Sequence, residues 1–479
     1  RLWLPAVPDR SPIASAAAIA CAVGALTAPV AATAAGTSAP TAGALGTLSQ
    51  LQGSRGCVAD RSRPSGCTPV RALRGPAPFL GSRAIAITPD GRSVYVASSG
   101  SNAVAAFRRD AASGRLTQRA GATGCIADRG ASGCARATGL IGPNSVAVSA
   151  DGRSVYATAV TTAAVVTFRR NRSTGALTQT GCVAARAAPG CAVGRALDGA
   201  DVIVVSADGR SVYAGAFKGN AVAVFSRNTS SGALTQPADA TGCLVDTPVS
   251  GCTTGLALGA PEGLAISADG TSVYVASAAS NALAILVRST STGALTQAAD
   301  GSGCIVDAPR TGCTTGTQLG GANAVALSPD DGDVYVTSLL SNTVTAFTRT
   351  PATGALAQQT GTSACVIYVL AVGCSLARAL SQPEGLAVSP DGASLYAAAF
   401  GSDAVDVLTR NTSSGAVIQK SRSAGCVTGG AAPDCALGRA LDGVSSVAVS
   451  PDGRHVYSAA FSSNAVSVFR RVSKTRGKG

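Results

Sequence analysis

Short apolar segments alternate with turn residues along most of the chain, and one arrangement of them recurs. In one copy the pattern predicts strands at 146–149, from Val155, at 164–168 and at 176–179, with tight turns at Asp151-Gly152 and Thr174-Gly175. Short β-branched segments separated by Asp-Gly and Thr-Gly pairs are typical of β-hairpins. Four antiparallel strands of this kind form one propeller blade, so each copy is expected to build a blade.

A tyrosine marks every copy and gives the period of the repeat. The steps between successive markers are 61, 57, 61, 61, 61 and 61 residues, at Tyr95, Tyr156, Tyr213, Tyr274, Tyr335, Tyr396 and Tyr457. A fixed period of this size indicates a propeller or a solenoid.

The two ends of the repeat region complement each other. Residues 47–50 look like a fourth strand without the first three, whereas the copy around Tyr457 stops after its third strand at 465–469. The N-terminal strand is therefore expected to complete the last blade, which removes an exposed sheet edge. The sequence predicts an all-β fold, a seven-bladed β-propeller with four antiparallel strands per blade over residues 44–470.

Fifteen cysteines add a second regularity. Cys21 stands alone, and the other fourteen form close pairs between the fourth strand of one copy and the first strand of the next: Cys57/Cys67, Cys125/Cys134, Cys182/Cys191, Cys243/Cys252, Cys304/Cys313, Cys365/Cys374 and Cys426/Cys435. This spacing favours disulfides over zinc, which usually takes cysteines two to four residues apart, often with histidine. The loops are expected on one face, either as staples or as a binding surface.

Residues 1–35 have the layout of a secretory signal peptide. Arg10 precedes an apolar run rich in Ala and Thr at 12–35, which ends in small residues. Cleavage near residue 35 is expected, and an uncleaved anchor is the alternative. The expected mature chain has a linker at 36–43, the propeller at 44–470, a basic tail at 471–479 and no membrane span. It is expected to be a monomer that is secreted or associated with the cell envelope.

The net charge of +13 changes this picture little, since Arg470, Arg471, Lys474, Arg476 and Lys478 at the C-terminal end supply five of the charges. A nucleic-acid binder would need a basic stripe interleaved with aromatic residues, and none is visible in the sequence. Nucleic acid is therefore not expected as a partner. A solvated surface is the simplest explanation of the charge, and contact with anionic envelope polymers is the alternative.

The repeated unit Val-Ala-Val-Ser-Pro-Asp-Gly, as at 447–453, followed by Val-Tyr, resembles the YVTN-type repeat. It is similar to the seven-bladed lactonase family, which includes 6-phosphogluconolactonase-like and muconate-cycloisomerase-like propellers. The resemblance covers about residues 44–470 and implies the fold more strongly than an activity, because propellers host unrelated functions. The paired cysteines depart from the family pattern and indicate an exported offshoot.

One position varies between copies while its neighbours repeat. Twelve residues before each marker tyrosine lie Arg83, Asn144, Asp201, Glu262, Asn323, Glu384 and Ser445. Each is expected where the innermost strand begins, so that together they ring the mouth of the central channel on the side of the cysteine loops. Diverse polar groups are what an asymmetric ligand site requires. A hydrated channel mouth without a ligand is the alternative.

Pro143-Asn144, Pro261-Glu262-Gly263 and Pro383-Glu384-Gly385 also resemble the Pro-Asn-Gly segment of the six-bladed gluconolactonases. That resemblance implies oxygen ligands for Ca²⁺ or a similar divalent cation. The cation would polarise a lactone carbonyl while a carboxylate activates water. Glu262, Glu384 and Arg83 are the candidate catalytic residues, with Arg83 holding an acidic substrate. The candidate metal ligands are Asn144, Asp201, Glu262, Asn323 and Glu384, and the other candidate ligand-binding residues are Arg83 and Ser445.

Other polar residues are interpreted as structural. The single histidine, His455, is expected on the surface beside an Asp-Gly turn, which weakens the case for an enzyme. A set of repeated asparagines suits left-handed turn positions: Asn102, Asn220, Asn281, Asn342 and Asn464. Two functions remain open. One is a small-molecule site at the channel mouth, with lactone hydrolysis as its reaction, and the other is non-catalytic binding of an extracellular or envelope partner.

Overall fold

The computed structural model describes residues 44–473 except 63–65, 77–82, 131–132 and 431. The predicted leader and linker, Cys21 and residues 474–479 of the tail lie outside the described residues. The chain divides into two compact units, 1–42 and 43–479, and the second unit holds all the described structure.

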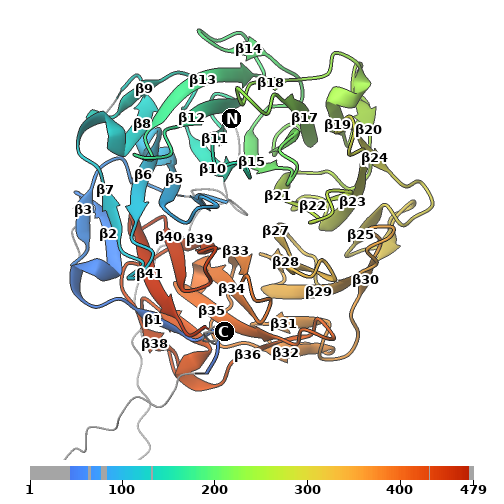
Figure 1. Ribbon diagram of the computed structural model, residues 1–479. Helices are drawn as coiled ribbons and strands as arrows, with labels where there is room; N and C mark the ends of the chain where they lie inside the picture. Colours follow the sequence, from blue (N-terminus) through green and yellow to red (C-terminus); the bar gives the residue numbers. More distant parts are fainter. Residues whose placement is uncertain (1–43, 63–65, 77–82, 131–132, 431, 474–479) are drawn as a thin grey trace, which may run out of the picture. The chain divides into compact units, whose positions relative to one another are not determined.

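Seven sheets surround a central channel, as predicted (Figure 1). The first strand of each blade is the innermost one. In blades 1 to 7, in order, these strands are β4 (Ile85–Ile87), β10 (Pro143–Val148), β15 (Ala200–Val205), β21 (Pro261–Ile266), β27 (Ala322–Leu327), β33 (Pro383–Val388) and β39 (Val444–Val449). The second strands are β5 (Ser93–Ser98), β11 (Ser154–Ala159), β16 (Ser211–Ala216), β22 (Ser272–Ser277), β28 (Asp333–Ser338), β34 (Ser394–Ala399) and β40 (His455–Ala460). The third strands are β6 (Ala103–Arg109), β12 (Ala164–Arg170), β17 (Ala221–Arg227), β23 (Ala282–Arg288), β29 (Thr343–Arg349), β35 (Ala404–Arg410) and β41 (Ala465–Arg471).

The outer part of each blade is more elaborate than four antiparallel strands. In six blades the fourth strand is in two pieces. These pieces are β7 (Leu116–Gln118) and β8 (Cys125–Asp128) in blade 1; β18 (Leu234–Thr235) and β19 (Cys243–Val245) in blade 3; β24 (Leu295–Gln297) and β25 (Cys304–Val306) in blade 4; β30 (Leu356–Gln358) and β31 (Cys365–Ile367) in blade 5; β36 (Val417–Gln419) and β37 (Cys426–Thr428) in blade 6; and β1 (Leu48–Gln50) and β2 (Cys57–Asp60) in blade 7. Single 3-10 turns lie in four of these breaks: η1 (Gly53–Gly56), η3 (Gly121–Gly124), η5 (Ala240–Gly242) and η7 (Arg422–Ala424). Two more, η2 (Ser99–Ser101) and η6 (Phe400–Ser402), follow second strands.

Blade 2 shows why the fourth strand is interrupted in the other six blades. It is the copy with the short step of 57 residues, and its fourth strand β13 (Leu177–Ala184) runs without interruption. The four additional residues of the other copies lie between the two pieces, so they loop out of the strand.

A short fifth strand, which the sequence analysis did not predict, accompanies each cysteine loop and pairs in parallel with the strand before the loop: β9 (Ala135–Ala137), β14 (Ala192–Val193), β20 (Thr253–Thr254), β26 (Thr314–Thr315), β32 (Cys374–Leu376), β38 (Ala436–Leu437) and β3 (Thr68–Val70). The fifth strand forms the outer edge of its blade.

The prediction that the fourteen paired cysteines form disulfides within their own loops is confirmed. The seven disulfides join Cys57 and Cys67, Cys125 and Cys134, Cys182 and Cys191, Cys243 and Cys252, Cys304 and Cys313, Cys365 and Cys374, and Cys426 and Cys435. Each of them links the fourth strand of a blade to the start of the fifth, so it closes a loop at the outer edge of the blade. Seven disulfides indicate an oxidising environment.

The predicted closure of the ring is confirmed. Strand β1 pairs with β41 antiparallel, with Leu48 opposite Arg471 and Gln50 opposite Phe469. The N-terminal strand thus completes blade 7 beside the last strand of the chain (Figure 1).

A buried arginine joins each blade to the one before it, and we call these seven contacts the blade locks. Arg288 in blade 4 is typical. Its Nε donates to the Tyr213 hydroxyl at 2.8 Å, and its Nη2 donates to Asp208 at 2.8 Å and to the Ser211 hydroxyl at 3.0 Å. The tyrosine in turn donates to the carbonyl of Gly293 at 2.7 Å. The marker tyrosine and the Asp-Gly turn of one blade thus together bind the lock arginine of the next blade.

The same lock recurs around the ring. The arginines are Arg109, Arg170, Arg227, Arg288, Arg349, Arg410 and Arg471, each bonded to the Asp-Gly-turn aspartate of the preceding blade. Because Arg109 of blade 1 binds Asp452 and Tyr457 of blade 7, the last lock closes the ring. Buried charges are tolerated when they are paired and hydrogen-bonded, as these are.

The prediction that His455 lies on the surface is wrong. His455 is 2% exposed and takes the lock position that serine occupies in most blades, with its Nδ1 2.9 Å from Nη2 of Arg109. Burial and the positive charge of Arg109 lower the pKa of His455 to about 4. The imidazole is therefore neutral inside the fold at neutral pH.

The repeated asparagines are structural, as predicted. Asn220 has a left-handed backbone with φ 46°, and its side chain accepts a hydrogen bond from the backbone nitrogen of Ala260 in the next blade at 2.8 Å. Asn102, Asn281, Asn342 and Asn464 repeat this contact. Blade 2 has Ala163 at this position, with φ 50°. No helix among the described residues is long and apolar enough to cross a membrane.

Candidate functional site at the channel mouth

The seven variable polar residues lie where the inner strands begin. Arg83 precedes β4, and the other six are the second residues of their strands. In each of those six strands the register shifts at this residue, as between Pro261 and Gly263 around Glu262. A β-bulge leaves a residue outside the ladder and re-aims its side chain, and bulges are frequent beside functional sites.

The seven residues were predicted to ring the channel mouth, and the side chains of the six strand residues are buried there. Their exposed fractions range from 0% to 5%, for Asn144, Asp201, Glu262, Asn323, Glu384 and Ser445. Two amides bridge to the next blade. Asn144 Nδ2 donates to Asp201 Oδ1 at 2.5 Å, and Asn323 Nδ2 donates to the carbonyl of Pro383 at 3.1 Å. Of the seven, Arg83 is the one that lines the channel cavities.

Three carboxyl groups gather around this mouth. Burial raises the pKa of Asp201 well above its ordinary value, although the hydrogen bond from Asn144 opposes this. Burial raises the pKa of Glu262 well above its ordinary value too, and the charges of Asp201 and Glu384 raise it further. Burial alone raises the pKa of Glu384 to about 8. Like charges close together in a poorly solvated site raise one another's pKa values and titrate as a group.

Several polar atoms of this group have no hydrogen-bond partner. Asn144 Oδ1, Asp201 Oδ2 and Glu262 Oε2 are buried and unbonded, and they come from blades 2, 3 and 4, which are consecutive. Buried polar atoms in proteins are nearly always bonded, so each exception needs an explanation such as a bound molecule. The seven blade locks together have a single unbonded atom of this kind, Arg170 Nε. Three unbonded oxygens in adjacent blades therefore distinguish this mouth from the locks.

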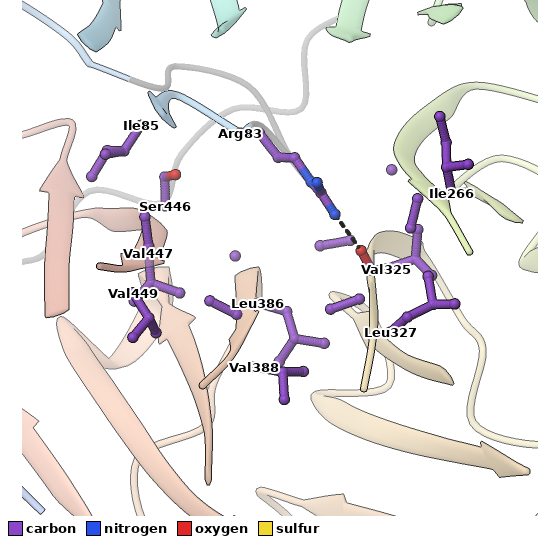
Figure 2. A pocket seen from close by; sticks show the side chains of 17 residues that line it. Arg83, Ile85, Ile266, Val325, Leu327, Leu386, Val388, Ser446, Val447 and Val449 are labelled. Carbon is purple, nitrogen blue, oxygen red and sulfur yellow. Dashed lines mark hydrogen bonds between the residues drawn. The ribbon is translucent and has the colours of Figure 1, made fainter. Parts of the chain in front are cut away.

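Arg83 extends across the central channel. Its Nη2 donates to the carbonyl of Val325 in blade 5 at 2.9 Å (Figure 2). The side chain borders two hollows, one of about 370 Å³ towards blades 4 to 7 and one of about 300 Å³ towards blades 1 to 3. The walls are otherwise apolar side chains and inner-strand backbone, including Ile266, Leu386 and Val447. A cation on apolar walls is suited to orient one polar or anionic group of a small molecule.

The predicted cation site stays a prediction, since its ligand set includes the amides of Asn144 and Asn323 beside three carboxyls. Within the described ranges, no three His, Cys, Asp or Glu side chains gather closely enough to hold a metal ion. Asn323 is occupied as well, since its Oδ1 accepts hydrogen bonds from the Ala324 backbone at 2.9 Å and from the Thr337 hydroxyl at 2.7 Å.

The glycines of the Pro-Glu-Gly segments have a packing role. A Cβ on Gly263 would lie 2.5 Å from the carbonyl oxygen of Asn323, and one on Gly385 would lie 2.7 Å from that of Ser445. Neighbouring inner strands can approach this closely only at glycine. The likeness to Pro-Asn-Gly thus has a structural cause in this chain.

A simple feature of the sequence also points to this mouth. Glu262 and Glu384 are the only glutamates of the chain, and its other 23 acidic residues are aspartates. The longer side chain is used at only two positions, and both lie in the variable ring. Residue-type counts could therefore have singled out these two residues without any motif.

The fold and the site define a disulfide-linked, seven-bladed propeller with a cluster of buried carboxyl groups at one end of its channel. The family model for the seven-bladed β-propeller lactonases matches residues 81–194 and 264–432. The chain belongs to this lactonase family.

Solved structures agree with the fold. The periplasmic gluconolactonase of Pseudomonas aeruginosa is 20% identical, with a TM-score of 0.50 over 74% of this chain and 85% of that one. The hydrazine synthase of Kuenenia stuttgartiensis is 18% identical, with a TM-score of 0.50 over 82% of this chain and 96% of that one. Likeness at this level shows the fold alone. Comparison with curated proteins finds no match.

Proposed function

We propose that this chain is an extracytoplasmic lactonase whose substrate, a small polar lactone, binds beside Arg83 at the channel mouth. The observation that carries the proposal is the group of buried, unbonded oxygen atoms on Asn144, Asp201 and Glu262. Family membership supports a lactone as the substrate class. The seven disulfides support a location outside the cytoplasm, secreted or in the cell envelope.

In the proposed reaction Arg83 polarises the lactone carbonyl, and water attacks the carbonyl carbon. The carboxyls of the group are buried and do not line the cavities beside Arg83, so the proposed reaction requires one of these side chains to turn into the cavity, where in its ionised form it accepts the proton of that water. The bond between the carbonyl carbon and the ring oxygen then breaks, and the ring oxygen takes a proton from a protonated carboxyl. Glu384 is suited to the acid role, because its pKa is raised to about 8. One water is consumed and one hydroxy acid is formed.

The test is a screen of five- and six-membered sugar lactones with the full chain, following acid release above the rate in buffer. We expect Glu384→Gln and Arg83→Met each to lower kcat by about a hundredfold, a typical contribution of a general acid or of one preorganised donor. Asp239→Asn is the matched control, since Asp239 is an exposed carboxylate that accepts hydrogen bonds from Thr241 in its own turn.

The pH profile gives a second readout. If Glu384 acts as an acid, activity falls as pH rises through about 8, and this fall disappears in Glu384→Gln. Hydrolysis that is unchanged in both site variants would refute the placement of the site. No hydrolysis of any lactone would refute the reaction.

A second function, non-catalytic binding of an envelope or extracellular partner, is favoured by one loop. The blade 5 cysteine loop exposes Val369 at 65%, Leu370 at 73% and Val372 at 104%. The corresponding blade 4 segment, 307–311, reads Asp-Ala-Pro-Arg-Thr. If exchanging 368–372 for that segment abolishes association with isolated envelopes, and no lactone is hydrolysed, this function replaces the first.

A further inference from the structure

The face opposite the cysteine loops carries a sector of exposed arginines. This turn face holds the Asp-Gly turns between first and second strands and the turns between third and fourth strands. The residue after the Asp-Gly turn is Arg92 in blade 1, Arg153 in blade 2, Arg210 in blade 3 and Arg454 in blade 7, and all four are exposed. In blades 4, 5 and 6 the same position holds Thr271, Gly332 and Ala393.

A second repeated position reinforces the first. The residue before the lock arginine is Arg108, Arg169 or Arg470 in blades 1, 2 and 7, whereas blades 3 to 6 have Ser226, Val287, Thr348 and Thr409. The Arg109 nitrogen donates to the Arg92 carbonyl at 2.8 Å, and blades 2 and 7 repeat this bond. Each of these three adjacent blades therefore presents a pair of exposed arginines, one immediately before the second strand and one on the third strand.

Arg115 and Arg172, in the turns that follow β6 and β12, bring the exposed arginines of the sector to nine. We call these nine residues the arginine arc. The turn aspartates of the same blades do not cancel it, because each is bound by a buried lock arginine. Among the described residues of this sector, Asp110 is the acidic residue that no lock neutralises. The arc is therefore a strongly positive surface confined to four neighbouring blades.

We propose that the arginine arc binds a flexible, linear polymer of phosphate groups. Guanidinium groups recognise phosphate with two parallel hydrogen bonds, and the arc contains arginine and no lysine. Its charges follow the curve of the ring, which a flexible chain can follow and a straight duplex cannot. A flat bilayer would also meet blades 4 to 6, where the two repeated positions carry no charge.

The aromatic residues argue against single-stranded nucleic acid as the occupant. The exposed aromatic side chains of the described residues are Phe217, Tyr368 and Phe461, and all three lie in loops of the opposite face. Single-stranded nucleic acids bind by stacking bases on aromatic rings in a basic groove. The arc offers charge without stacking, which suits a backbone of phosphates that carries no bases.

The experiment measures binding of a long linear polyphosphate to the full chain by fluorescence anisotropy over a range of salt concentrations. The test variant combines Arg92→Thr, Arg153→Thr and Arg454→Thr, which copy the residue that blade 4 has at this position. The control combines Arg55→Thr, Arg119→Thr and Arg136→Thr, three exposed arginines on the side of the cysteine loops. Both variants lose the same charge.

We expect the arc variant to bind at least about tenfold more weakly, with the slope of log affinity against log salt reduced by about 2, as for three lost phosphate contacts on a flexible strand. The control should keep the wild-type affinity and slope. Equal losses in both variants, or no binding by the wild type, would overturn the proposal. So would wild-type binding to single-stranded DNA or to anionic phospholipid vesicles that is as tight as binding to polyphosphate.

Discussion

Two rings of seven residues lie at opposite ends of this propeller and differ in almost every respect. The blade locks near the turn face repeat nearly the same residues in every blade. The channel mouth carries seven positions filled by five residue types, with unbonded oxygen atoms on three of them. Burial acts on the lock aspartates too, but hydrogen bonds from serine, backbone and arginine outweigh it, so their pKa values are lowered. The carboxyls of the mouth have raised pKa values, because burial meets no such compensation.

The contrast separates stability from function within one repeat. A contact that every blade needs uses nearly the same residues in each copy, and its polar atoms are hydrogen-bonded in nearly every copy. A site that binds one ligand occurs only once, so its residues must differ between the seven blades. Strained or unsatisfied groups are expected at functional sites and are compensated by the rest of the fold. The four predictions below test this division, from the largest expected effect to the smallest.

Breaking a lock should destabilise the protein most. Arg109→Ala leaves Asp452 and the Tyr457 hydroxyl without the buried partner that closes the ring. Loss of one member of a buried ion pair costs about 3–5 kcal/mol of unfolding free energy. Denaturant unfolding at pH 7 measures it. The neighbouring exposed arginine provides the control, and Arg108→Ala should change stability by less than about 0.5 kcal/mol. Similar losses in both variants would show that the lock adds nothing.

Replacing a carboxyl at the channel mouth with a neutral amide should stabilise the protein, in contrast to the loss of a lock. The pKa of Glu384 is raised from 4.5 to about 8, so between these values the folded protein holds a proton that the unfolded chain releases. Stability therefore falls as pH rises across this window. Glu384→Gln removes this loss and should stabilise the protein at pH 9 by about 2–4 kcal/mol, since one pKa unit corresponds to about 1.4 kcal/mol. Unfolding curves at pH 5 and pH 9 check it, and equal effects at both would contradict it.

His455 is the exception within the lock ring and should make the protein sensitive to acid. Its pKa is lowered from 6.5 to about 4, so the unfolded chain takes up a proton first and stability falls as pH drops through this window. His455→Ser restores the residue of the other locks. It should raise stability at pH 5, relative to pH 8, by about 1–2 kcal/mol. Thermal melts at the two pH values measure the difference. If His455→Ser changes stability equally at pH 5 and pH 8, titration of this histidine does not explain the sensitivity to acid.

The smallest effect is expected from repairing a missing contact. Ala163 has a left-handed backbone where five other blades have asparagine and one has Asp403. Ala163→Asn suits that backbone and supplies a side-chain acceptor towards blade 3, so we expect a gain of about 0.5–1 kcal/mol. Chemical denaturation measures the gain. The reverse change, Asn220→Ala, should cost a similar amount, and unchanged stability in both variants would show that this contact is neutral.

The fold could be predicted because its determinants are local and periodic. The marker tyrosines, the Asp-Gly turns and the cysteine pairs repeat at a nearly constant spacing, and the partial copies at the two ends predicted the closure of the ring. The locks were not predicted because each one joins an arginine to an aspartate at least 76 positions away in another blade, and no local spacing in the sequence pairs these residues. His455 was misplaced for the same reason, since a residue beside a turn looks exposed until the next blade covers it.

The position of the site was predicted from the sequence, but the burial of its side chains was not. Variation at one place in the repeat located the seven residues, from Arg83 to Ser445. The bulges of the inner strands then bury six of the side chains, and no spacing in the sequence reveals a bulge. That Arg83 reaches the carbonyl of Val325 in blade 5 depends on closure of the ring, which places blades 1 and 5 around one channel.

The completion of blade 7 by β1 has a consequence for how the protein is made. Each disulfide joins cysteines only 9 or 10 residues apart, so every one of them can form as soon as its own loop meets an oxidising environment. The first strand of the propeller, in contrast, can pair only after the last strand is available, because β1 pairs with β41 and the Tyr396 hydroxyl donates to the carbonyl of Gly46. Contacts between residues so distant in sequence form slowly. A chain that emerges from its N-terminal end can therefore be cross-linked in every blade while its sheet edges at both ends are still open, and release of the C-terminal strand is the step that allows the ring to close.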